Sequence, residues 1–177
     1  MNYQVYFQKA SLKSFLSLQL LVGISLFGLM LFESSLAIFD VFLYGAPYFT
    51  FTIFFILTIF YPVALPLLSV FLVTIFHDIF ATSLSNSQTF AILLSLIIIK
   101  RLMTFPEQRD FLEIWQGFGI AVAIVTLVQS LFFMATELAW INLQGLIFQF
   151  GISLLLYPFL HAMTLRVAQV FVQSAER

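Results

Sequence analysis

The chain has 177 residues, of which 62% are hydrophobic and 8% are charged, and its mean hydropathy is +1.09. Soluble domains carry about 25% charged residues, so this composition indicates an integral membrane protein. A net charge of -1 with seven Lys and Arg residues excludes an extended phosphate-binding surface, so nucleic acid is not an expected partner. The absence of cysteine excludes disulfides, thiolate metal sites and a cysteine nucleophile.

The N-terminal segment, residues 1–13, carries two lysines just before an uncharged stretch. Lys9 and Lys13 precede residues 14–32, which contain no charged residue. The apolar region of a cleaved signal peptide is only about 7 to 15 residues long, so this stretch is too long for one. We therefore expect a retained first transmembrane helix whose basic flank lies in the cytoplasm.

The longest stretch without charge or histidine, residues 41–76, exceeds the length of one transmembrane helix. A single helix would reach about 54 Å, whereas the hydrocarbon core is about 30 Å thick. Pro62 and Pro66 each remove a backbone donor, which predicts a break between two helices here. Dividing the stretch places all seven basic residues on the N-terminal side, whereas leaving it whole places only two there. The positive-inside rule therefore favours six helices with both termini in the cytoplasm.

We expect an all-α integral membrane fold with six transmembrane helices. They are predicted over residues 14–32, 41 or 47 to 60, 62–81, 88–101, 113–136 and 143–165, so the membrane domain covers 14–165 and a cytoplasmic tail 166–177. Residues 82–88 form a polar external turn, and Thr104 with Glu107 gives a capping-box pattern that opens the fifth helix. Trp115 is expected near the inner headgroups and Trp140 near the outer ones.

Two polar residues, His77 and Asp78, close the predicted third helix, and Thr74 lies one turn earlier on the Asp78 face. A charged side chain at membrane depth costs about 2.5 to 3.5 kcal/mol or more, so it normally faces a partner, a cavity or an interface. One interpretation is a structural or partner-contacting carboxylate beside the external turn. The equally weighted alternative is a helix-end aspartate hydrated by headgroup water and by Ser83 or Ser85.

The last two predicted helices carry further polar candidates. On the fifth helix, Glu137 shares a face with three residues at helical spacing, Thr126, Ser130 and Phe133. It pairs with a neighbouring group or, as the favoured explanation, lies in interfacial water. On the sixth helix, Asn142 and Gln149 share a face with Gly145 and Ser153, which favours a structural seam over a ligand site. Pro158 kinks or opens this helix, and the following His161 lacks a second ligand at metal-binding spacing.

The remaining patterns favour a structural role over chemistry. The 24 phenylalanines are spread along every predicted helix, which fits lipid-facing bulk and packing better than an aromatic ligand pocket. An aspartyl dyad would need two carboxylates at similar depth, whereas Asp40 and Asp78 flank loops without motif residues. Charges lie at helix ends, away from the midplane where a channel or ion-coupled transporter would need them. We expect no enzymatic activity, cofactor or metal.

Several sequence elements follow one another in an order typical of a known family. They are Pro47 opening the second helix in Ala46-Pro47-Tyr48-Phe49, the segment 71–79 with Asp78, the polar turn before the helix from Phe90, the basic pair Lys100-Arg101, and Leu156-Tyr157-Pro158-Phe159-Leu160 before Arg166. In order and spacing these elements resemble the MreD family of bacterial rod-shape-determining proteins, over about residues 47–172. Thr74 stands where that family usually has glycine, and residues 85–87 stand where it has a Pro-Leu-Gly-like turn.

This resemblance implies a fold similar to the substrate-binding components of energy-coupling-factor vitamin transporters. It also implies a non-enzymatic inner-membrane scaffold that binds MreC and links MreB filaments to peptidoglycan synthesis, in one complex with RodZ, RodA and a class B penicillin-binding protein. The alternative within that fold is a vitamin-binding transporter component, which needs a ligand cavity and small-residue docking motifs. The predicted first helix has no Ala-x-x-x-Ala motif, and its shared face carries Ser17, Leu21, Ser25 and Gly28. A third class, a small intramembrane hydrolase, lacks its carboxylate dyad.

Overall fold

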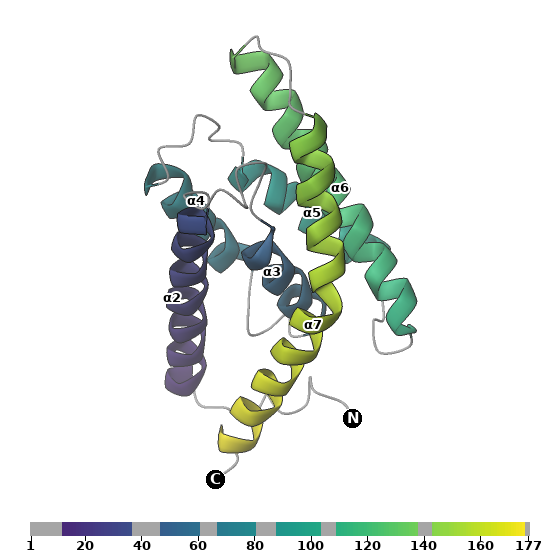
Figure 1. Ribbon diagram of the computed structural model, residues 1–177. Coiled ribbons are helices and arrows are strands. Elements are labelled where there is room, and N and C mark those ends of the chain that lie inside the picture. The colour runs from purple at the N-terminus through teal and green to yellow at the C-terminus, as the bar shows by residue number, and fades with distance from the viewer. Residues whose placement is uncertain are drawn as a thin grey trace.

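The computed structural model describes residues 12–36, 47–60, 67–80, 88–103, 109–137 and 143–175, and every regular element in these ranges is an α-helix. The helices are α2 (Leu12–Leu36), α3 (Phe49–Phe60), α4 (Leu67–Phe80), α5 (Gln88–Leu102), α6 (Phe111–Glu137) and α7 (Leu143–Ala175), shown in Figure 1. The predicted all-α class is confirmed.

The helix bounds follow the hydrophobic pattern closely at some ends and depart from it at others. Both ends of α5 and α6 lie within two residues of their predicted positions. Helix α3 begins at Phe49, which agrees with the alternative that starts at Pro47. The last span was predicted to end at Leu165, and the apolar segment of α7 ends at Val167, while the helix itself continues to Ala175. Residues 166–175 contain no proline or glycine that would stop a helix.

Local chemistry sets the starts of α3 and α6. Pro47 lies just before α3, where its missing N–H would in any case have no helical partner, and Thr52 N–H donates to the Tyr48 carbonyl at 3.0 Å. In the same way Ile114 N–H donates to the Asp110 carbonyl at 3.2 Å at the start of α6. The predicted capping box at residues 104–107 and the proline break at residues 61–66 lie outside the described residues.

The helices contact one another in a closed ring, and α3 is one member of it. Going round the ring, α2 contacts α4, α4 contacts α5, α5 contacts α6, α6 contacts α7, and α3 closes it between α7 and α2 while also contacting α5. The largest fully buried side chains include Phe54 and Phe55 of α3, Phe118 of α6 and Tyr157 of α7. The core therefore forms where α3 meets the two longest helices.

The outer surface is also apolar. Exposed large hydrophobic side chains include Leu127 and Leu131 on α6 and Ile147 and Leu155 on α7, at 60%, 59%, 71% and 77% exposure. Helices that are hydrophobic on both their packed and their exposed faces are typical of a protein surrounded by lipid, because water would not solvate such a surface. In the described part of the chain, the segments Phe111–Thr136 and Leu143–Val167 are long and apolar enough to cross a membrane.

The middle helices are short over the residues that the structure describes, and residues 61–66 and 81–87 beside them lie outside that part of the chain. Helices α3, α4 and α5 have 12, 14 and 15 residues. At 1.5 Å per residue they extend about 18 to 23 Å, against a core of about 30 Å. Over its described residues the protein is thus helical, with two helices long and apolar enough to cross a membrane.

Candidate functional site: polar connections between the helices

Asp78 bridges the end of α4 and the beginning of α5. Its Oδ2 atom accepts the backbone N–H of Thr89 at 3.0 Å and the Thr89 hydroxyl at 2.7 Å. Thr89 lies in the first turn of α5, where backbone N–H groups have no partner within the helix and the helix dipole attracts negative charge. Asp78 therefore caps the following helix.

This contact distinguishes between the two interpretations of Asp78. The side chain is half-buried and holds a specific group of the next helix, which fits the structural interpretation. The expected donors Ser83 and Ser85 lie outside the described residues, as does the side chain of neighbouring His77. The site that the sequence identified is thus a connection between α4 and α5.

Glu33 makes an equivalent connection between α2 and α3, which the sequence analysis did not anticipate. Its Oε2 atom accepts the backbone N–H of Thr50, in the first turn of α3, at 2.8 Å. As with Asp78, a carboxylate near the end of one helix occupies the positive end of the next helix along the chain. In the sequence, Glu33 directly follows the uncharged residues 14–32, and the next helix begins after Pro47. A carboxylate in this position was the signal that could have identified the connection.

Tyr48 connects the start of α3 to both long helices. Its backbone N–H donates to the Ser153 hydroxyl oxygen of α7 at 3.0 Å, and its own hydroxyl donates to Gln129 Oε1 of α6 at 2.7 Å. The Ser153 hydroxyl in turn donates to the Gln149 carbonyl at 2.6 Å, one turn earlier in α7. Hydrogen bonds of this kind hold membrane helices together, because an unsatisfied polar group in hydrocarbon is costly.

The structure places the remaining sequence candidates as follows. Ser153 and Gly145 are buried along the predicted face of α7, so this face is a packing seam, and Gln149 contributes its backbone carbonyl to it. Asn142 and the side chain of Glu137 lie outside the described residues. On α6, Gln129, adjacent in sequence to the predicted Ser130, accepts a hydrogen bond from Tyr48, just before α3.

Pro158 lies inside α7 and leaves one backbone carbonyl without its usual donor. The amide of residue 158 would normally bond to the carbonyl of Leu154, four residues earlier, but proline has no N–H. The indole Nε1–H of Trp115 on α6 donates to that carbonyl at 3.1 Å. Trp115 was expected near the inner headgroups, and the structure shows that its donor group is used on a neighbouring helix.

Aromatic side chains fill the space around this proline. The Tyr157 ring stacks on Phe118 of α6, with centroids 4.4 Å apart and planes at 24°, and packs edge-on against Phe55 of α3 at 6.0 Å. The Tyr157 hydroxyl lies 3.2 Å from His161 Nδ1, and the His161 ring lies 5.4 Å from that of Phe60. These rings contact one another across three helices, which fits the packing interpretation of the phenylalanines.

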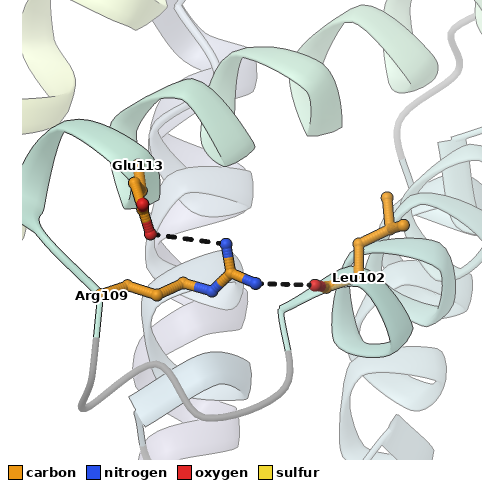
Figure 2. Close-up of polar contacts among 3 residues, drawn as sticks. All are labelled: Leu102, Arg109 and Glu113. Carbon is orange, nitrogen blue, oxygen red and sulfur yellow. Dashed lines mark hydrogen bonds and ion pairs between the residues drawn. The ribbon is translucent and has the colours of Figure 1, made fainter.

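Just before α6, Arg109 links the end of α5 to the beginning of α6, as Figure 2 shows. Its Nη2 atom donates to the Leu102 carbonyl at 3.2 Å, and its Nη1 atom lies 3.5 Å from Glu113 Oε2. Leu102 is the last residue of α5, where carbonyls lack helical donors, and Glu113 lies in the first turn of α6. The side chain therefore connects α5 to α6 at an exposed position, opposite in charge to the Asp78 cap.

Comparisons of the chain with family models, with curated proteins and with solved structures find no significant match. No known relative assigns a role to these residues, so only their contacts indicate what they do. Asp78 and Glu33 accept from helix N-termini, and Trp115 and Arg109 donate to backbone carbonyls. Tyr48 bridges to α6 and α7, whereas the buried hydroxyls of Thr50 and Thr58 have no hydrogen-bond partner in the described part of the chain. This arrangement fixes the positions of helices relative to one another, and among the described residues no three His, Asp or Glu side chains group as a metal site would require.

Proposed function

We propose that the chain is a non-enzymatic scaffold with six membrane spans, located in the bacterial inner membrane with both termini in the cytoplasm, and that it acts as MreD-family proteins do. In this proposal it binds a single-span periplasmic protein of the MreC type. Through that partner it belongs to a cell-elongation complex with MreB, RodZ, RodA and a class B penicillin-binding protein, and it helps maintain rod shape.

The observation that carries this proposal is the use made of the interior polar groups. Asp78, Glu33 and Tyr48 each connect a helix start to another helix. A molecule whose polar side chains hold its helices in place, and whose outer surface is apolar, offers partner helices a rigid surface within the membrane. Rigidity of this kind suits a scaffold better than a transporter that must alternate between two arrangements.

The distribution of charge supports the proposed orientation. In the six-span topology all seven Lys and Arg residues face the cytoplasm, while Glu33, Asp40, Asp78 and Glu137 are the charged residues on the external side. The two described carboxylates of that external group, Glu33 and Asp78, are both bound to helix N-termini. Their negative charge is thereby stabilised by the positive ends of the following helices.

The orientation can be tested directly because the chain has no native cysteine. Single cysteines at positions 85 and 109 would be treated in intact cells with an impermeant thiol reagent. We expect labelling at 85 and none at 109 until the cells are opened. Labelling at 109 in intact cells would refute the six-span arrangement.

The scaffold role requires a second experiment. The affinity-tagged protein would be purified from its native membranes, and the gene would be deleted in the same strain. We expect co-purification of a single-span periplasmic partner and conversion of rods to spheres on deletion. Tight binding of a vitamin together with co-purified nucleotide-binding subunits would instead establish the transporter alternative, and normal rods after deletion would contradict the scaffold role.

A further inference from the structure

A proline in the middle of α7 creates a local defect in that helix. Pro158 removes the donor for the Leu154 carbonyl, and its ring would clash with that carbonyl in a straight helix, so the helix must bend. Figure 1 shows that α7 changes direction along its length. The size of such a bend can vary, because the hydrogen bond that would limit it is missing.

Helix α6 supplies three contacts at this defect from one of its faces. Trp115 donates its indole N–H to the Leu154 carbonyl, and Phe118 stacks on Tyr157, the residue before the proline. Gly119, one turn after Trp115, lies against the Leu154 side chain, and an added Cβ there would stand 3.4 Å from Leu154 Cδ2, an ordinary van der Waals contact.

We infer that Trp115 and Pro158 form a coupled pair that fixes the direction of α7, with the indole N–H of Trp115 taking the place of the amide that proline lacks. The pair acts as a latch between α6 and α7. It determines the direction in which the second half of α7 runs, and hence the position of its last turns up to Ala175. This inference does not depend on the proposed scaffold function.

The latch makes the effects of changing Trp115 and Pro158 depend on each other. In the native chain, Trp115→Phe leaves the Leu154 carbonyl without a donor. In a Pro158→Ala background the restored amide binds that carbonyl, so the same substitution leaves no donorless group. The smaller ring of phenylalanine leaves the same gap in both backgrounds, so the gap cancels in the comparison and the difference reports the hydrogen bond alone.

The test measures the distance across the bend in the full chain. Spin labels would be attached to cysteines at two exposed positions, Ile24 on α2 and Val167 on α7, which are 64% and 50% exposed. We expect one narrow distance distribution for the native sequence, a broadened one for Trp115→Phe, and a narrow but shifted one for Pro158→Ala. The double variant should match Pro158→Ala alone. Equal broadening by Trp115→Phe in both backgrounds, or no broadening in either, would overturn the inference.

A matched control removes a similar bond elsewhere. Ser95 of α5 donates its hydroxyl to the Ala121 carbonyl of α6 at 2.9 Å, but that carbonyl keeps its own helical donor at Val125. Ser95→Ala should leave the distance distribution unchanged. If Trp115→Phe alone cannot be purified, its recovery in the Pro158→Ala background shows the same coupling, whereas equal loss in both backgrounds overturns the latch.

Discussion

The cap formed by Asp78 is the polar contact whose removal has the best-defined expected cost. One carboxylate oxygen accepts two hydrogen bonds from Thr89, at 3.0 and 2.7 Å, at the beginning of α5. Asp78→Leu removes the acceptor of both hydrogen bonds and leaves the backbone N–H of Thr89 without this partner. We expect a loss of about 1 to 3 kcal/mol in the free energy of unfolding from the hydrogen bonds. The lost interaction with the helix dipole adds about 0.3 to 1 kcal/mol.

Two further variants separate the contribution of the negative charge from that of the hydrogen bonds. Asp78→Asn keeps an oxygen acceptor and loses the negative charge, so it should cost only about 0.3 to 1 kcal/mol. Thr89→Val removes the hydroxyl donor and keeps the backbone donor, so it should cost about 0.5 to 1.5 kcal/mol, the usual net value of one hydrogen bond. The expected order of destabilisation places Asp78→Leu above both.

Unfolding in detergent, followed by helical circular dichroism during titration with a denaturing detergent, would give these free energies for the purified protein. Thermal stability and expression level would be recorded alongside. A solvated helix-end aspartate would tolerate leucine, because a helix end near the membrane surface gains from apolar burial. If Asp78→Leu matches the native protein in all three measurements, the assignment of Asp78 as a cap is refuted.

Three further predictions use the same unfolding assay. Glu33→Leu should cost about 1 to 2 kcal/mol because Thr50 N–H loses its carboxylate, while Glu33→Gln keeps an acceptor and should cost less; equal costs would contradict the cap. Gly117→Ala should cost about 1 kcal/mol or less, because the flexible end of Met103 that occupies the space of the new Cβ can move, and Gly117→Val should cost about 1 to 3 kcal/mol. If valine is tolerated as well as alanine, that packing is loose. Arg109→Ala should cost less than about 1 kcal/mol because its ion pair with Glu113 is exposed, so a loss equal to that of Asp78→Leu would contradict the reasoning.

The extent of the helices was largely predictable from the sequence, because the signals that start and stop a helix are local. Both ends of α5 and α6, and the start of α3 after Pro47, follow from the change between apolar and polar or proline-containing segments. The predicted last span ends at Leu165, whereas α7 continues to Ala175, because a basic residue such as Arg166 limits the apolar segment but does not stop a helix. A helix continues through such a boundary until a residue breaks it.

The polar connections were only half predictable. Asp78 could be identified from sequence because a charge that closes an apolar stretch needs an explanation, whereas its partner Thr89, 11 residues further on, depends on how α4 and α5 pack. Glu33 met the same criterion and was passed over, since its partner Thr50 lies 17 residues away in the next helix. A carboxylate near the end of one apolar helix, followed by another helix start, is a pattern that would have found both.

The defect in α7 separates most clearly what each level of structure determines. The sequence alone requires that the Leu154 carbonyl lack an amide partner, because the hydrogen bonds of a helix connect residues four apart and residue 158 is proline. Only the tertiary structure decides that the missing donor comes from Trp115, 39 residues away in the chain. That choice depends on the rotation and the separation of α6 and α7, which follow from side-chain packing between them, such as that of Phe118 on Tyr157, and not from a local signal in either helix.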